Sequence, residues 1–442
     1  MTMLVGAAEV VITPPLGVEI SGYGPRRRLR STEVHRQLSA QALVFGHDGE
    51  EAALLVCDVV AVTPDFVDAV RSRVTSTTGI PAHNVMVAAT HSHSSPNTGG
   101  LSDFGRTDAQ YVRILARIVA GAVGWAKRNA RPSRLFVGRS SHDGLAWNRT
   151  NDASVDDSVH TVHVVSEDGA VTAVLGQYAC HPVILGPGTI LSPDFPGAFR
   201  DTIRSAHPAC VALFVNGACG DIDPVTNREV WGQGTVDDIR HHGERLAEAA
   251  LSAVRSAEPV SAPGIGVSSA TMRLDYDVPP ADEVERRIAF YSAQKQRRGK
   301  RPDDGFGAPA AGEGSMPRFW LRYYERLERK LAQRSLADHE LVELQALHLG
   351  ADTVLVAIPA EVYSEHGVRI KEDSALAHTI PVCYANGCCG YLPPEREFRD
   401  RGYTATLAAA AYDRPPFRPD VAEVLVRNVR ELLKNGNSRA ER

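Results

Sequence analysis

The segment "VMVAATHSHSSPNTGG", residues 85–100, begins as an apolar strand, and two histidines, His91 and His93, follow that strand. Side chains two residues apart in an extended segment point the same way, so both imidazoles would face one site. Such a pair suits a metal centre or an acid/base pair, although paired histidines also end strands without any function. The residues at the ends of the other strands decide between these interpretations.

Composition and length bound the class of protein. The chain has 442 residues, more than the roughly 250–300 at which one hydrophobic core stops growing, so two lobes or one large unit with insertions are expected. Its net charge of -5 does not favour nucleic acid as a partner. Neither an apolar run long enough to span a membrane nor a secretory signal is recognisable. The seven cysteines are an odd number without a CxxC pair, which argues against a zinc knuckle. Reduced thiols fit best, so we expect a cytoplasmic protein without stable membrane association.

Strand-like and helix-like segments alternate along the chain. The run "EAALLVCDVVAV" (51–62) is typical of a strand, and "PDFVDAVRSRVTSTTG" (64–79) has the apolar spacing of a helix. A further helix is predicted at 236–255, with His241 and His242 on its exposed face. This alternation predicts an α/β fold with a mixed β-sheet core flanked by helices.

Residues 281–335 differ in character from the rest. The segments "ADEVERRIAFYSAQKQRRGK" and "PRFWLRYYERLERKLAQR" read as two charged helices around a loop rich in Gly, Ala and Pro. We interpret them as a helical hairpin inserted into a single catalytic domain that covers residues 1–442. The hairpin could serve as a lid, form an oligomer contact, or lie solvated on the surface. A homo-oligomer is compatible with the sequence.

Polar side chains come directly after several of the predicted strands. The active crevice of an α/β sheet lies outside the carboxyl ends of its strands, so strand-end residues converge on one site. Besides His91 and His93, the residues in such positions are His181 in "CHPVIL", Asp221 and Asp223 in "GDIDP", Glu361 in "PAEVYSEHG" and Tyr391 in "GYLPPE".

This set of side chains suits a divalent metal. A catalytic zinc ion typically takes three nitrogen or oxygen ligands from the protein and leaves one position for water. Tyrosine is an uncommon ligand because its free phenol has a pKa of about 10. Spacing alone does not decide whether Tyr391, Tyr384 or Tyr363 would be the tyrosine ligand.

The motifs together resemble one enzyme family. "THSHSSPNTGG" (90–100) is similar to the THTHSGPGG segment of the neutral/alkaline, non-lysosomal ceramidases. Further similar segments occur in the order of that family over nearly the whole chain: "GYG" (22–24), "VHRQLSAQALVF" (34–45), "NR" (148–149), "CHPVIL" (180–185), "GDIDP" (220–224), "PAEVYSEHGVRI" (359–370) and "GYLPPEREFRDRGYTAT" (390–406).

The resemblance implies roles for individual residues. It implies one Zn²⁺ per chain with the ligands His91, His181, Glu361 and Tyr391. It implies contacts with the scissile amide for His93, Arg149 and Tyr403. The spacing of twelve residues between Tyr391 and Tyr403 is the one found in the family.

Two departures from the family pattern bear on the substrate. Asp223 stands where the family has a serine, so an acyl-serine step is not available, and Asp223 could be a general base, a substrate contact or a ligand of a second metal ion. The signal peptide and C-terminal β-sandwich domain of secreted ceramidases are not recognisable in the sequence. We therefore expect the family's chemistry, zinc-dependent hydrolysis of an amide (N-acyl) bond, on a small soluble substrate rather than on ceramide.

Four further charged residues are candidates for supporting roles. Asp58 interrupts an apolar strand, where an unpaired carboxylate is costly, and we expect it to orient a ligand histidine. Asp194 is a similar candidate; the alternative for both is a capping or turn carboxylate. Arg27 and Arg28 would favour an anionic substrate if they face the site, and otherwise belong to a solvated loop.

Two other functions use the same residues. A metal-dependent esterase or lactonase would need the same activated water. A catalytically inactive metal-binding homologue would keep the ligands and lack turnover.

Overall fold

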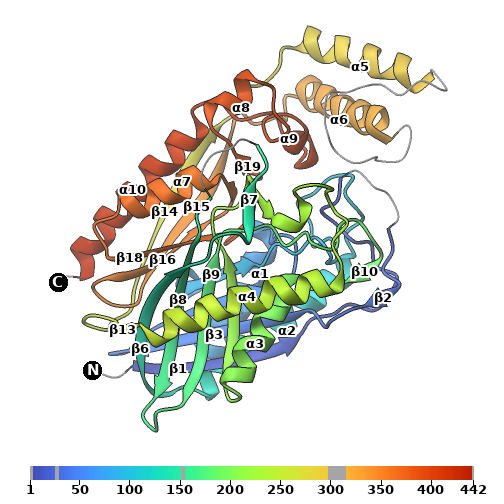
Figure 1. The fold of residues 1–442 in the computed structure, drawn as a ribbon. Helices are drawn as coiled ribbons and strands as arrows, with labels where there is room; N and C mark the ends of the chain where they lie inside the picture. Colours follow the sequence, from blue (N-terminus) through green and yellow to red (C-terminus); the bar gives the residue numbers. More distant parts are fainter. Residues whose placement is uncertain (1–2, 25–28, 151–154, 297–314, 441–442) are drawn as a thin grey trace.

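The computed structural model describes residues 3–24, 29–150, 155–296 and 315–440. Two β-sheets lie face to face, and helices cover both outer faces, so the molecule has four layers (Figure 1). The predicted mixed α/β architecture is confirmed, and the second sheet goes beyond the prediction. In the described part of the chain, no helix has the length and apolar character needed to cross a membrane.

The larger sheet has nine strands. Its pairs β11–β9 and β4–β5 are parallel and its other pairs are antiparallel. In spatial order the strands are β11 (Val211–Asn216), β9 (Val171–Tyr178), β8 (Ser158–Ser166), β6 (Arg131–Ser141), β1 (Met3–Val11), β3 (Ser39–His47), β4 (Glu50–Cys57) and β5 (Val85–Ala89), with β13 (Glu258–Pro259) paired to β6.

The smaller sheet packs on one face of the larger one. Its strands, in spatial order, are β14 (Gly266–Asp275), β15 (His339–His348), β16 (Thr353–Ile358) and β18 (His378–Cys383). Leu54 and Val162 of the larger sheet join Leu355 and Ile380 of the smaller one in a single buried cluster. Strands covered on both faces read as continuous apolar runs, which explains the pattern of β4.

Helices cover the two outer faces. On the larger sheet lie α1 (Pro64–Thr78), α2 (Ala109–Arg128), α3 (Phe195–Ala206) and α4 (Val236–Arg255). On the smaller sheet lie α7 (Ser364–Glu372) and α10 (Val421–Ala440). Local sequence fixes their ends: the Thr63 side chain caps α1, and Gly79 ends it in a left-handed conformation with φ of 81°.

The helix predicted at 236–255 is α4, with the same bounds. One expectation about it is wrong, because His242 is buried rather than exposed. Its ring centroid lies 4.5 Å from that of Phe195 in α3. Burial lowers the pKa of His242 to about 3, so the ring packs as a neutral group.

Short elements lie between the main strands and helices. The 3₁₀ turns are η1 (Ala82–Asn84) and η2 (Val225–Asn227), and the short helices are α8 (Glu395–Arg399) and α9 (Leu407–Ala411). The two-stranded pairs are β2 (Glu33–Val34) with β10 (Ile190–Leu191), β7 (Ala146–Asn148) with β12 (Ile222–Pro224), and β17 (Glu361–Val362) with β19 (Tyr391–Leu392).

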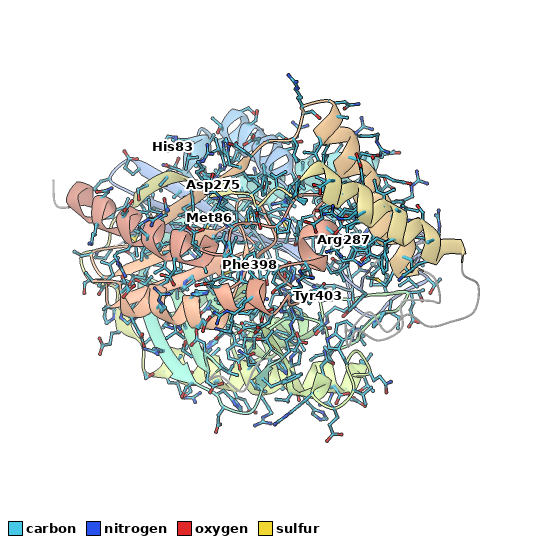
Figure 2. The ribbon with its side chains drawn as sticks, turned by 90° about the horizontal axis from the view of Figure 1, so that it is seen from above. His83, Met86, Asp275, Arg287, Phe398 and Tyr403 are labelled. Atoms are coloured by element: carbon cyan, nitrogen blue, oxygen red, sulfur yellow. The ribbon has the colours of Figure 1, made fainter. Side chains whose placement is uncertain are left out.

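The predicted insertion contains two helices between β14 and β15. They are α5 (Ala281–Gln296) and α6 (Ser315–Ala332), and they pack side by side at one end of the molecule (Figure 1). The view from above places Arg287 of α5 at this end and Tyr403 nearer the middle (Figure 2). Phe319 and Leu327 of α6 belong to a buried cluster with Leu407 of α9, so α6 is seated on the main body.

Candidate metal centre

Segments from both sheets bring the predicted ligands together. His91 follows β5 and His181 follows β9, both in the larger sheet. Glu361 follows β16 of the smaller sheet, and Tyr391 lies beyond β18. The parallel pair β17–β19 places Glu361 directly opposite Tyr391.

Backbone carbonyl groups orient the two histidine rings. His91 Nδ1 lies 2.6 Å from the Val60 carbonyl oxygen, and His181 Nδ1 lies 3.1 Å from that of Ile222. A carbonyl only accepts hydrogen bonds, so each Nδ1 carries the proton and donates it. Each Nε2 therefore presents a lone pair, as in metal-ligating histidines.

These lone pairs converge on a carboxylate oxygen. Glu361 Oε2 lies 3.3 Å from His91 Nε2 and 3.4 Å from His181 Nε2. All three side chains are at least 96% buried, and among the described residues neither Glu361 Oε2 nor His181 Nε2 has a hydrogen-bond partner. Three acceptors facing one another in a dry interior repel unless a cation lies between them.

The spacing of these atoms fits a tetrahedral site. Ligand atoms at the usual zinc distances of about 2.0–2.1 Å lie about 3.3–3.4 Å from one another when the geometry is tetrahedral. The two nitrogen–oxygen separations at Glu361 match that edge length. The donor set of two imidazole nitrogens and one carboxylate oxygen therefore fits a divalent metal ion such as Zn²⁺.

His93 adjoins this set. Its Nε2 lies 3.0 Å from His91 Nε2, and ligand atoms of His91, His93 and His181 lie within 4.8 Å of one another, so the three histidines form a group that could hold a metal. The ring is confined by Gly22, where a Cβ atom would lie 2.6 Å from it. His93 is thus either a ligand itself or a titratable group in direct contact with the ligand His91.

Burial controls the protonation of these groups. It lowers the pKa of His91, and burial together with His91 and His181 lowers that of His93 well below the ordinary value, so both rings are neutral. Burial and Glu361 raise the pKa of Tyr391, which keeps it a phenol.

Arg149 forms a second network beside the acceptors. Its Nη1 donates to Asp223 Oδ1 at 3.1 Å, and its Nη2 donates to the Gly220 carbonyl at 2.8 Å and to the Tyr391 hydroxyl at 2.9 Å. Trp231 Nε1 donates to Asp223 Oδ2 at 3.0 Å. Both oxygens of the fully buried Asp223 already accept hydrogen bonds, an arrangement that fixes Arg149 rather than leaving a free base.

Tyr403 stands at the edge of this network. Its ring centroid lies 6.1 Å from that of Tyr391, with the rings nearly perpendicular. Burial raises the pKa of Tyr403 to about 12, so its hydroxyl is a donor at neutral pH. Of the alternative tyrosines, Tyr384 stacks on the His91 ring at 3.9 Å and Tyr363 bonds to Thr404.

The predicted role of Asp58 needs correction. Its carboxylate accepts hydrogen bonds from Arg200 at 2.9 and 2.6 Å, from the Ser39 backbone, and from Thr90 Oγ1 at 3.3 Å. It therefore forms a buried ion pair beneath the strand end instead of contacting a histidine ring, and its link to His91 is the backbone of Thr90.

Asp194 is a helix-capping residue, which is the alternative role considered for it from the sequence. It accepts hydrogen bonds from the backbone N–H groups of Phe195, at 2.8 Å, and Leu185, at 3.3 Å, at the start of α3. Burial raises its pKa to about 7 against the effect of these donors. Arg27 and Arg28 lie outside the described residues.

Several residues of the centre carry no sequence signal. Tyr412, after an alanine run, donates its hydroxyl proton to Glu361 Oε1 at 2.8 Å. Backbone carbonyls orient the histidines, and any residue type could supply them. His91 itself has a left-handed backbone with φ of 68°, a conformation that is costly outside glycine and typical of functional sites.

Solved structures of ceramidases share this fold. No family model and no curated protein matches the sequence. Among solved structures, the neutral ceramidase from Pseudomonas aeruginosa matches with a TM-score of 0.74 and 19% identity, covering 99% of this chain and 75% of that chain. A ceramidase complexed with C2 matches with a TM-score of 0.73 and 17% identity, covering 99% and 76%. The ceramidase-like fold predicted from the motifs is confirmed.

Proposed function

We propose that this protein is a zinc-dependent hydrolase that cleaves an amide (N-acyl) bond of a small substrate. The observation that carries the proposal is the convergence of His91 Nε2, His181 Nε2 and Glu361 Oε2, three buried acceptors aimed at one point. The ceramidase-like fold and the motif resemblance favour an amide as the scissile bond.

We assign the ligands as His91, His181 and Glu361, with Tyr391 as the fourth. The register of β17 and β19, which puts Tyr391 opposite Glu361, supports this choice over the other tyrosines. A Zn²⁺ ion held by these residues would supply Lewis acidity, which in catalytic zinc sites lowers the pKa of a bound water to about 7.

Three other side chains act on the substrate. Arg149, held by Asp223 and one-fifth exposed, offers N–H donors to the oxyanion, and losing one such donor typically costs about 10²–10³ in turnover. Tyr403 offers a hydroxyl donor beside it. His93 Nε2 lies 3.0 Å from His91 Nε2. With a cation on His91 Nε2, the neutral His93 ring would present its own Nε2 lone pair, which could take a proton from the attacking water and pass it to the leaving amine.

The experiment is a substrate screen on the zinc-reconstituted protein. The panel contains N-acyl amino acids, short-chain N-acyl amines, a ceramide analogue and the ester matched to each amide. We expect turnover of at least one amide class, loss of it with a chelator, and loss of it in His91→Ala. Esters cleaved without amides would favour the esterase, and zinc bound without any turnover would favour the inactive homologue.

A further inference from the structure

Two loops that border the proposed centre contain aspartates with unusual backbones. Asp103 lies in the loop that contains His91, and Asp413 directly follows Tyr412, the donor to Glu361. Their φ angles are 64° and 56°, in the left-handed region that residues other than glycine seldom occupy. Such conformations persist where surrounding contacts hold them.

Helix α6 of the insertion supplies these contacts. Arg322, Arg326 and Lys330 are four residues apart and so lie on one face of the helix. Arg322 Nε donates to Asp103 Oδ1 at 3.0 Å, and Lys330 Nζ donates to Asp413 Oδ2 at 2.9 Å.

Arg326 binds both aspartates at once. Its Nη1 donates to Asp103 Oδ2 at 3.1 Å and its Nε to Asp413 Oδ1 at 2.6 Å. The side chains of Arg326, Asp103 and Asp413 are 23%, 9% and 24% exposed, so water screens this bridge less than it screens an ordinary surface pair. A backbone bond from Ser102 N–H to the Ala411 carbonyl, 2.6 Å long, joins the same two loops.

The bridge continues to the carboxylate of the centre. Asp413 adjoins Tyr412, and the Tyr412 hydroxyl lies 2.8 Å from Glu361 Oε1. The Tyr412 ring packs closely over Gly390, where a Cβ atom would lie 2.8 Å from the ring. A shift of Asp413 would therefore carry Tyr412 away from Glu361.

We propose that Arg326 is a positioning residue of the metal centre: by bridging Asp103 and Asp413 it holds Tyr412 against Glu361 and so raises the affinity for zinc. The inference rests on the proposed function. It makes α6 a part of the site and not a lid or a solvated hairpin, two interpretations that the sequence left open.

The test is a double-mutant cycle on zinc affinity, measured by competition with a chromophoric chelator. Partners that orient a metal ligand typically contribute 10–100-fold in affinity, so we expect Tyr412→Phe and Arg326→Gln each to weaken zinc binding about 10-fold. In the Tyr412→Phe background, Arg326→Gln should weaken it by less than about twofold more. Arg329→Gln, on an exposed position of the same helix, is the matched control and should bind zinc like the wild type.

The possible results separate the two claims. Wild-type zinc affinity in Arg326→Gln would overturn the inference and leave the proposed function intact. If the fold-losses in zinc affinity of the two single variants multiply in the double variant, Arg326 does not act through Tyr412. A wild-type protein that binds no zinc would remove the proposed function and the inference together. If Arg326→Gln does not fold, Arg326→Lys, which keeps the charge but loses the two-sided geometry, should still show weakened binding.

Discussion

The pair formed by Arg149 and Asp223 allows the sharpest prediction from the geometry. We consider Arg149→Met, Asp223→Asn and the double variant. Asp223 is fully buried, and without Arg149 the hydrogen bond left to its carboxylate among the described residues would be that from Trp231. Arg149 is one-fifth exposed, and without Asp223 it would keep Gly220, Tyr391 and some water.

The two single substitutions should therefore differ in cost. Removing the partner of a buried charge costs about 3–5 kcal/mol, so Arg149→Met should lower the free energy of unfolding by about that much. Asp223→Asn should cost about 1–3 kcal/mol, because the charge left behind retains acceptors and solvent. The double variant contains neither charge, so its loss should fall short of the sum by at least about 2 kcal/mol.

Urea unfolding followed by far-UV circular dichroism measures all four proteins without a substrate. Trp231→Phe, which removes the hydrogen bond to Asp223 Oδ2 and keeps an aromatic ring beside Tyr23, serves as a control and should cost about 1 kcal/mol. Additive losses, or a larger loss in Asp223→Asn than in Arg149→Met, would refute the description of Asp223 as the buried anchor of Arg149.

Other predictions concern pH and the role of His93. Burial raises the pKa of Asp194 to about 7, so its carboxyl group ionises more readily in the unfolded chain than in the folded protein. As the pH rises from 4 to 8, the free energy of unfolding of the wild type should therefore fall by about 4 kcal/mol relative to that of Asp194→Asn. Urea titrations at several pH values measure this difference. Burial lowers the pKa of His242 to about 3, so on acidification this histidine is protonated in the unfolded chain before it is protonated in the folded protein. As the pH falls from 7 to 4, the free energy of unfolding of the wild type should therefore fall by about 3 kcal/mol relative to that of His242→Phe. Parallel plots of unfolding free energy against pH for the two proteins would contradict this. Gly22→Ala should displace the His93 ring and lower kcat more than about 10-fold with zinc content unchanged, whereas loss of zinc would identify His93 as a ligand.

Sequence reasoning predicted the elements and the strand ends well. Apolar periodicity is a local property, so α4 and the helices of the insertion could be found from it. His91, His181 and Glu361 were found because polar residues directly after apolar strands are conspicuous and because strand ends of an α/β sheet meet.

The remaining features depend on contacts between distant segments. Asp58 pairs with Arg200, 142 residues away, and no local pattern distinguishes that pairing from a contact with a histidine. Tyr412 reaches Glu361 over 51 residues from a segment without any motif. The burial of His242 depends on Phe195 in another helix, so the exposed face of α4 could not be assigned from α4 alone.

The central claim is that His91, His181 and Glu361 hold a zinc ion, and elemental analysis of the purified protein tests it most directly. We predict about one zinc per chain in the wild type, loss of it in His91→Ala and in Glu361→Gln, and retention in His83→Ala, which changes an exposed histidine seen at the edge of the molecule (Figure 2). No stoichiometric zinc in the wild type after reconstitution, or unchanged zinc in His91→Ala, would contradict the account.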